Sequence, residues 1–368
     1  MNPESPTRPR YLLIGPRPAH PRQWLSMSRY SSGLASLLAP GADVEQFQAS
    51  HWNPPPAARF LFSRYKNYKP FPRRWPTSLD LVHFTDIHLT VHARRFDVPR
   101  VATIHDLIPM DYGRMWPPIA TYGQFIYRRS CHALRHLDAI ITPSEDTRQK
   151  VISRLDRAPE RVFTVPVLIP GHLSPAITPA PRDPRTILSV GTSADYKNLP
   201  ALLHALAAPE LAGCRLVRVG EAFTPGQAAL AQKLGVASRV EHRGHVSEDG
   251  LVALLRSATV LAQPSLTEGF GMPVAEAMAC GLPVVVSNGG ALPEVAGRAG
   301  RVVPFRNLGS GPINLDDARD FARALAAVVE DPGLQQAMSA AGLAEVERFR
   351  APAVRDRLLE AYSAAAAR

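Results

Sequence analysis

Residues 263–287 read QPSLTEGFGMPVAEAMACGLPVVVS, and this stretch decides the fold. An apolar strand over 258–262 runs into it, and a Gly-x-Gly turn leads through Pro273 into a helix over 273–280 and a second apolar strand over 283–286. Short apolar runs of this kind are typical of buried parallel strands. Proline suits the first helical position, and glycine lets backbone N–H groups approach a ligand closely. The stretch therefore predicts a strand–turn–helix–strand unit with a ligand-binding turn.

Two carboxylates, Glu268 and Glu276, bracket that turn. Taken alone, two glutamates at this spacing are more often a solvated helix face than a site. The helix that starts between them points the positive end of its dipole toward whatever binds in the turn, which favours an anionic ligand. Both carboxylates are then expected to bind hydroxyl groups, and a sugar nucleotide offers this combination.

The same alternation of short strands and helices runs through both halves of the chain. In the first half, strands are expected at 11–15, 81–84, 101–104 and 139–142, with helices at 30–38 and 145–155. In the second half, strands are expected at 186–191, 216–220, near Val240, 258–262 and 283–286, with helices at 199–206, 225–234, 249–256 and 273–280. This order predicts an α/β fold of two Rossmann-like doubly wound domains facing across a cleft.

Proline crowds the stretch 166–185, where little periodicity is visible, so a linker is expected there. The expected organisation is an N-terminal domain over 1–170, a linker over 171–185, a second domain over 186–350 and a C-terminal helix over 351–368. The N-terminus lacks the pattern of a signal peptide and no apolar run has the length of a membrane span, so a cytoplasmic protein is expected.

Charge is distributed unevenly along the chain. The formal net charge is +10, and the whole excess lies in residues 1–180, with 23 Lys+Arg against 13 Asp+Glu, while residues 181–368 hold 19 of each. A basic half suits binding to a nucleic acid, an anionic membrane surface or a phosphorylated acceptor. A generally arginine-rich composition explains the excess of positive charge equally well. The segment 59–75 interleaves aromatic and basic side chains, which suits an interfacial membrane contact as well as a nucleic acid.

The run 263–287 closely resembles the signature of retaining glycosyltransferases of the family-4 (glycosyltransferase group 1) type, P-S-x-x-E-G-F-G-x-P-x-x-E-A-M-A-x-G-x-P-V-V. Residues 190–199, VGTSADYKNL, resemble the second recurrent motif of that family, V-G-T-x-x-x-x-K-N-L. Residues 103–109, TIHDLIP, resemble the H-D-L-x-P string of its mannosyltransferase-like branch. The resemblance implies a GT-B fold whose first domain binds the acceptor, whose second binds a nucleotide sugar, and whose C-terminal helix packs back on the first.

Roles in the donor site follow from the resemblance residue by residue. Glu268 is expected to bind the sugar hydroxyls. Glu276, in the first turn of its helix, is expected to bind the ribose hydroxyls. Lys197 is expected to bind the diphosphate, where it would neutralise the charge of the leaving group. The full donor-binding set is Lys197, Asn198, Glu268, Gly269, Phe270, Gly271, Met272 and Glu276. A basic residue usually precedes the lysine of this motif, but Thr192, Ser193 and Asp195 stand in those places, so Arg243 is the substitute considered.

The remaining candidates lie in the first half. A histidine after a strand is more often structural, but by resemblance His105 lines the site near the transferring sugar and acts with Glu268 and Lys197 in catalysis. Asp106 either orients His105 or caps the helix that follows. Asp106 is also a candidate on the acceptor side, together with Ser26, Ser28 and Arg29, which align with the family's G-I-G-R-Y segment with serine in place of both glycines.

These features predict a retaining hexosyltransferase that moves mannose from GDP-mannose to a hydroxyl of a glycan or lipid-diphosphate-linked acceptor. The expected process is cell-surface polysaccharide or lipopolysaccharide synthesis, and the basic half is expected to make a peripheral membrane contact. No metal-binding or phosphate-loop motif occurs, so neither a metal nor a further cofactor is expected. The alternatives are transfer from a UDP- or dTDP-sugar, a nucleotide-sugar epimerase of similar architecture, and a basic nucleic-acid-binding protein. The run 263–287 argues against nucleic-acid binding, which does not require it.

Overall fold

A computed structural model describes residues 8–16, 25–49, 75, 78–111, 120–176, 183–309, 311 and 313–367. Within these ranges, the side chains of residues 25–28, 49, 111 and 120–126 are not described. The aromatic and basic segment 59–74 lies outside the described residues, so the membrane contact suggested for it stays a prediction. None of the helices in the described ranges combines the length and apolar character that a bilayer crossing needs.

The chain divides into two compact units. The first contains residues 1–168 and 351–368, and the second contains 169–350. The predicted linker 171–185 therefore falls inside the second unit, and residues 177–182 of it lie outside the described ranges. Hydrogen bonds explain this grouping, because the N–H of Ile169 donates to the carbonyl of Phe349 (2.9 Å) and Arg350 Nη1 donates to the carbonyl of Pro170 (2.7 Å).

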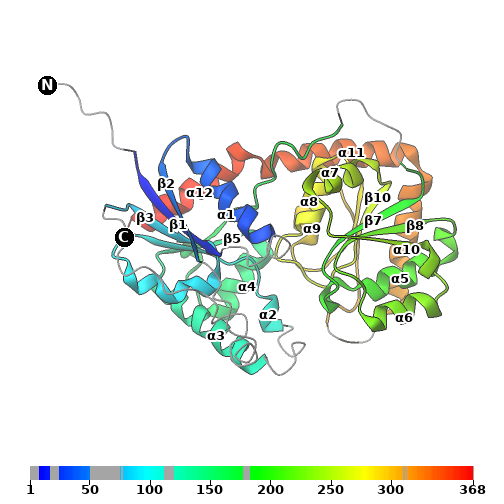
Figure 1. Ribbon diagram of the computed structural model, residues 1–368, viewed down its shortest axis with the longest axis horizontal. Coiled ribbons are helices and arrows are strands. Elements are labelled where there is room, and N and C mark those ends of the chain that lie inside the picture. The colour runs from blue at the N-terminus through cyan, green and yellow to red at the C-terminus, as the bar shows by residue number, and fades with distance from the viewer. Residues whose placement is uncertain are drawn as a thin grey trace. The chain divides into compact units, whose positions relative to one another are not determined.

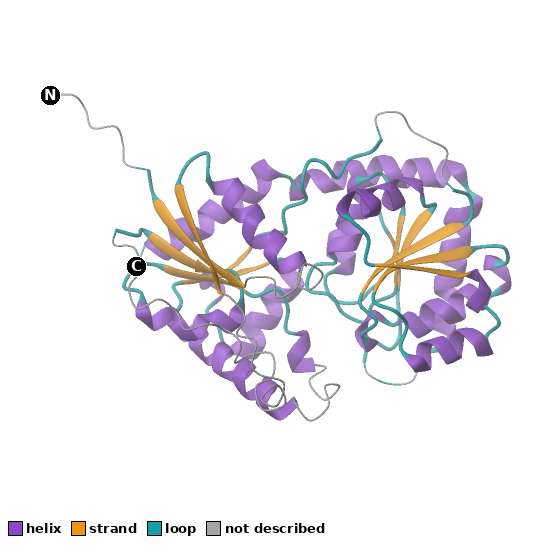
Figure 2. Ribbon diagram, viewed as in Figure 1, coloured by secondary structure: helices purple, strands orange, loops and turns teal. Residues whose placement is uncertain are grey.

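The first unit is a parallel sheet covered by helices on both faces (Figures 1 and 2). Its strands, in the order β2-β1-β3-β4-β5-β6, are β1 (Arg10–Pro16), β2 (Asp43–Ala49), β3 (Leu81–Phe84), β4 (Arg100–Thr103), β5 (Ala139–Thr142) and β6 (Val162–Thr164). One face carries α1 (Leu25–Leu38) and α12 (Ala351–Ala366). The other carries the 3₁₀ segment η2 (Ile87–Arg95), α3 (Ala120–Ala133) and α4 (Glu145–Leu155), and a short helix α2 (Ile108–Asp111) follows β4.

The second unit repeats this plan with the strand order β12-β11-β10-β7-β8-β9. The strands are β7 (Thr186–Gly191), β8 (Arg215–Gly220), β9 (Val240–Gly244), β10 (Val260–Gln263), β11 (Val284–Ser287) and β12 (Arg301–Val303), all parallel. One face carries α5 (Leu199–Ala207), α6 (Pro225–Lys233) and α10 (Leu315–Glu330). The other carries α7 (Glu248–Ser257), α8 (Met272–Ala279), α9 (Leu292–Ala296) and α11 (Pro332–Val346) (Figure 1). Two doubly wound sheets, as the strand and helix pattern predicted, are confirmed.

Strand order places the candidate site. In the second unit the chain moves outward from β7 through β8 to β9 and then returns to the other side of β7 with β10. Open parallel sheets bind ligands beyond the carboxyl ends of the strands at such a reversal, because the two adjacent loops diverge there and leave a crevice. The loops after β7 (191–198) and after β10 (264–271) flank this position, and both carry residues singled out in the sequence.

Candidate functional site

The two loops at the reversal are joined by an ion pair. Lys197 Nζ lies 2.7 Å from Glu268 Oε1, and the two side chains are only 12% and 9% exposed. A second link is the bond from the Leu266 N–H to the Tyr196 carbonyl, at 2.7 Å. Lys197 ends the 3₁₀ turn η6 (Asp195–Lys197), which directly precedes α5. The structure therefore brings together two of the three residues expected to act in catalysis.

One oxygen of Glu268 is held by several donors and the other is left open. Besides Lys197, the amide Nε2 of Gln263 and the hydroxyl of Ser265 each donate to Oε1 at 2.7 Å. No described residue donates a hydrogen bond to Oε2. A carboxylate fixed through one oxygen keeps its orientation while the second oxygen accepts a hydrogen bond from a ligand hydroxyl.

Lys197 is charged in this setting. Burial disfavours its ammonium form, but the adjacent carboxylate of Glu268 and the Tyr196 side chain together favour it more strongly, so the pKa of Lys197 lies above its ordinary value. The ring of Tyr196 lies 5.3 Å below the ammonium and adds a cation–π contact. The site thus presents a fixed positive charge where an anion would bind.

The glycine turn opens the helix α8 as the sequence indicated. Gly271 has φ +95°, a conformation that L side chains rarely adopt, and a Cβ there would lie 2.9 Å from Leu292 Cδ2. No side chain caps this helix start, and the N–H groups of Phe270 and Gly271 donate no hydrogen bond within the described residues. These donors are available to a ligand.

Glu276 lies one residue further from the start of α8 than expected. The helix begins at Met272, so Glu276 occupies its fifth position, in the second turn rather than the first. Its side chain is 6% exposed. The sequence placed the helix start at Pro273, but the left-handed Gly271 already serves as the N-cap and allows the helix to begin one residue earlier.

The turn 289–290 braces the glutamate loop from behind. A Cβ on Gly290, which has φ +58°, would lie 2.5 Å from the Glu268 carbonyl oxygen and 2.6 Å from its nitrogen. The N–H of Ala291 donates to the same carbonyl at 3.1 Å. The close approach of two backbones holds Glu268 in place, and only glycine permits it.

The structure also shows a buried cation that the sequence reasoning missed. Arg218 on β8 is 1% exposed, and its Nη2 donates to the carbonyls of Gly191 and Thr192 at 2.7 Å each. Burial lowers the pKa of Arg218 to about 10. Arg243, the substitute considered from the sequence, is about half exposed and pairs with Glu241 on the edge strand β9. The signal for Arg218 was a charged residue inside the apolar run 216–219.

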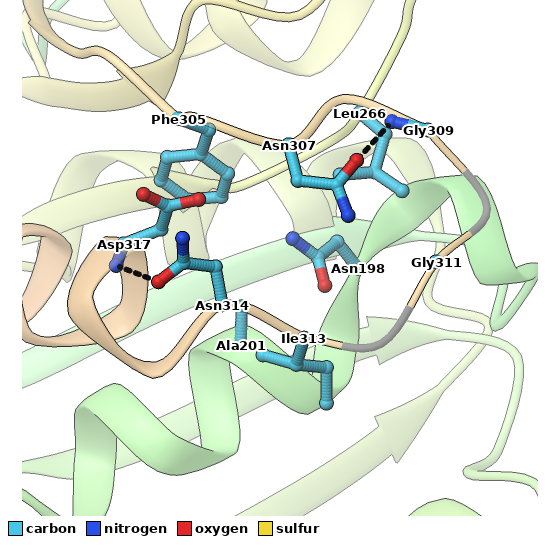
Figure 3. A pocket seen from close by; sticks show the side chains of 10 residues that line it. All are labelled: Asn198, Ala201, Leu266, Phe305, Asn307, Gly309, Gly311, Ile313, Asn314 and Asp317. Atoms are coloured by element: carbon cyan, nitrogen blue, oxygen red, sulfur yellow. Dashed lines mark hydrogen bonds between the residues drawn. The ribbon is translucent and has the colours of Figure 1, made fainter.

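A pocket in the second unit is lined in part by the loops after β7 and β10 (Figure 3). Asn198, one of the expected donor residues, and Leu266 form part of its wall. The opposite wall comes from the segment after β12 and from the start of α10, where Asn314 Oδ1 accepts the N–H of Asp317 at 3.4 Å. Amide groups of Asn198, Asn307 and Asn314 gather around the opening, so the pocket presents hydrogen-bonding groups next to the loop that carries Lys197.

His105 belongs to the first unit. Its Nε2 lies 3.0 Å from the Thr85 carbonyl, so this nitrogen carries the proton and donates. The ring of Tyr30 packs edge-on against the imidazole, with centroids 4.7 Å apart. Of the two roles considered for Asp106, the helix cap is observed, because its Oδ1 accepts the N–H of Ile108 at 3.0 Å at the start of α2.

The other acceptor-side candidates lie in α1. The helix begins at Leu25, earlier than the expected start at Tyr30, so Ser26, Ser28 and Arg29 are helical. The side chains of Ser26 and Ser28 lie outside the described residues, and their role stays a prediction.

Two parallel α/β units, with a buried ion pair at the strand reversal of the second, correspond to the fold of GT-B glycosyltransferases. Residues 28–169 match the family model "Glycosyltransferase Family 4", and residues 173–344 match "Glycosyl transferases group 1". The chain belongs to the group 1, family-4 type of glycosyltransferases.

Curated relatives match part of the chain. An MMP alpha-(1->4)-mannosyltransferase of Mycolicibacterium hassiacum is 32% identical over 213 residues, which cover 55% of this chain and 51% of that protein. The serotype-specific mannosyltransferase WbdA of Escherichia coli is 27% identical over 266 residues, covering 68% and 31%. D-inositol 3-phosphate glycosyltransferase of Mycobacterium tuberculosis is 30% identical over 237 residues, covering 58% and 48%. The matched region thus spans about half or less of the length of these relatives.

Solved structures share the whole fold. Sucrose-phosphate synthase from Thermosynechococcus elongatus aligns with a TM-score of 0.71 at 19% identity and covers 97% of this chain and 98% of its own. Anabaena HepE, solved in complex with UDP and glucose, aligns with a TM-score of 0.68 at 16% identity and covers 96% and 99%.

Proposed function

We propose that the chain is a retaining glycosyltransferase that moves a hexose from a nucleotide diphosphate sugar to a hydroxyl acceptor. The observation that carries this proposal is the buried pair of Lys197 and Glu268 at the strand reversal of the second unit. A leaving diphosphate needs a cation, and a sugar needs hydrogen-bond acceptors for its hydroxyls. Lys197 supplies the first and the open Oε2 of Glu268 supplies the second.

The same residues suggest how transfer proceeds. The bond between the anomeric carbon and the diphosphate oxygen breaks, and negative charge develops on that oxygen. Lys197 and the open N–H groups of Phe270 and Gly271 stabilise this charge, which is a preorganised electrostatic effect and requires no metal ion. The acceptor oxygen forms its bond to the anomeric carbon on the face that the diphosphate leaves, and its proton passes to the departing phosphate oxygen. Glu268 holds the sugar and forms no bond to it.

Mannose from GDP-mannose is the proposed donor. Support comes from two relatives whose names describe mannosyltransferases and from the His105-Asp106-Leu107-x-Pro109 string. A lipid-diphosphate or glycan acceptor in cell-surface polysaccharide synthesis is the proposed acceptor class, because it suits a first half whose formal charge is +10 and because WbdA is serotype-specific. Transfer of another hexose from a UDP- or dTDP-sugar is the alternative.

Nucleotide release tests the proposal directly. The purified chain is incubated with GDP-mannose, UDP-glucose or dTDP-glucose, with and without polyprenyl diphosphate-linked saccharides, and the free nucleotide is measured. Acceptor-dependent GDP release and an axial product linkage by NMR are expected. Release of an altered free sugar without acceptor would instead indicate an epimerase. No turnover of any donor, together with unchanged nucleotide affinity in Glu276→Ala, would refute the site.

A further inference from the structure

Four buried polar side chains of the first unit form one continuous chain of hydrogen bonds. Tyr362 Oη on α12 lies 2.8 Å from His83 Nδ1 on β3, and His83 Nε2 lies 2.8 Å from Thr103 Oγ1 on β4. Thr103 Oγ1 lies in turn 2.9 Å from Tyr30 Oη on α1. The hydroxyl of Tyr30 is therefore anchored through two strands to the C-terminal helix.

This chain of hydrogen bonds lies in a dry interior. His83 and Thr103 have no measurable exposure, and Tyr30 and Tyr362 are 6% and 3% exposed. Burial lowers the pKa of His83 to about 3, so the ring is neutral and offers one donor and one acceptor nitrogen. With His83 neutral, all three bonds form in either direction along the chain. Each member supplies the partner that its neighbour would otherwise lack, so a change at one end propagates to the next.

The last member of this chain of hydrogen bonds, Tyr30, packs against the candidate catalytic histidine, His105. The imidazole of His105 is held on one side by the Thr85 carbonyl at 3.0 Å and on another by the ring of Tyr30. Because Nε2 donates to that carbonyl, the neutral ring has its lone pair on Nδ1. Both the direction of that lone pair and the packing against Tyr30 depend on where the Tyr30 ring is fixed.

We infer that Tyr30 is a positioning residue for His105, and that Tyr362 of the C-terminal helix fixes it through His83 and Thr103. The inference rests on the proposed function only in its kinetic part, since the orientation of His105 is measurable without a substrate. The ligand group that His105 would bind is a hydroxyl, because Nδ1 of a neutral imidazole accepts a hydrogen bond from a hydroxyl.

Histidine-ring NMR of the full chain tests the inference. His105 is assigned by the loss of its signals in His105→Gln, and its ring ¹³C and ¹⁵N shifts are compared in Tyr30→Phe and Tyr362→Phe. Both variants keep the aromatic ring and remove the hydroxyl. We expect the His105 signals to move in both, more strongly in Tyr30→Phe, and kcat to fall about 10- to 100-fold with donor KM unchanged.

Tyr11→Phe is the matched control. The ring of Tyr11 also packs edge-on against Tyr362, with centroids 5.1 Å apart, but its hydroxyl is not part of the chain of hydrogen bonds. In Tyr11→Phe, the His105 signals should stay at their wild-type positions. Thr103→Val and Thr103→Ser provide a second pair of variants. The His105 signals should move in Thr103→Val, which lacks the hydroxyl, and stay at their wild-type positions in Thr103→Ser, which keeps it.

A purely structural network would give a different result. In that case Tyr30→Phe and Tyr362→Phe would lower the melting temperature while the His105 shifts stayed unchanged, and the inference would be wrong. Absence of any transferase activity in the wild-type chain would refute the proposed function and leave the NMR comparison valid.

Discussion

Replacing Lys197 by methionine should destabilise the second unit measurably. The change leaves Glu268, whose side chain is 9% exposed, without its counter-charge in a largely dry site. Removing one partner of a buried pair costs about 3–5 kcal/mol, because an uncompensated charge stays buried. Gln263 and Ser265 still donate to Oε1, so the loss should lie near the lower end, about 3 kcal/mol.

A double-mutant cycle makes the test specific. The free energy of unfolding is measured by urea denaturation, followed by circular dichroism, for the wild type, Lys197→Met, Glu268→Gln and the double variant. Glutamine keeps the shape of the glutamate side chain without its charge, so the double variant should recover about 0.5–3 kcal/mol relative to the sum of the single changes. Additive single effects, or a loss below 1 kcal/mol in Lys197→Met, would show that the pair is not coupled as the geometry indicates.

Two further predictions concern the two units separately. Because burial lowers the pKa of His83 to about 3 from 6.5, its contribution to stability is present above pH 6.5 and lost as the pH falls toward 3. Between pH 7 and 4.5 the free energy of unfolding of the wild type should therefore fall by about 2–3 kcal/mol more than that of His83→Asn. Urea denaturation followed by tryptophan fluorescence measures this, since all four tryptophans lie in residues 1–168. Equal losses in the two proteins would contradict the low pKa of His83. Gly290→Ala should cost at least about 1–2 kcal/mol through its left-handed backbone alone, with a further cost from the clash with Glu268, and should weaken nucleotide-sugar binding in calorimetry. Gly226→Ala, with open space around the new methyl group, serves as its control and should be neutral or slightly stabilising.

Local sequence patterns were sufficient to predict the two sheets and the turn that opens α8. Strand β10, the Gly-x-Gly turn and α8 follow one another within a few residues, so their geometry depends on short-range rules of apolar alternation and helix initiation. The helix expected over 145–155 is observed as α4 for the same reason, and the Ser144 hydroxyl at its start accepts the N–H of Thr147. The family membership rests on these local motifs too.

Features that depend on distant contacts were not predicted. Arg218 stands 27 residues from the Gly191 carbonyl that it binds, and nothing near it in sequence marks that contact. Tyr362 and His83 are 279 residues apart. The linker over 171–185 stays a prediction from local proline content, whereas the hydrogen bonds that residues 349 and 350 make with residues 169 and 170 join parts of the chain that are distant in sequence. Strand β2, which reads DVEQFQA, has too few apolar residues to be recognised.

The position of α12 has a consequence for biosynthesis. The first unit is begun at residue 1 but contains residues 351–368, whose buried side chains include Val354, Leu358 and Tyr362. A ribosome that adds roughly 5–20 residues per second needs about 10–40 s to pass from residue 168 to residue 351. During that time the second unit is synthesised in full while the first lacks one of the helices that cover its sheet. The unit whose synthesis starts first is therefore completed after the other unit, once the residues of α12 have been synthesised.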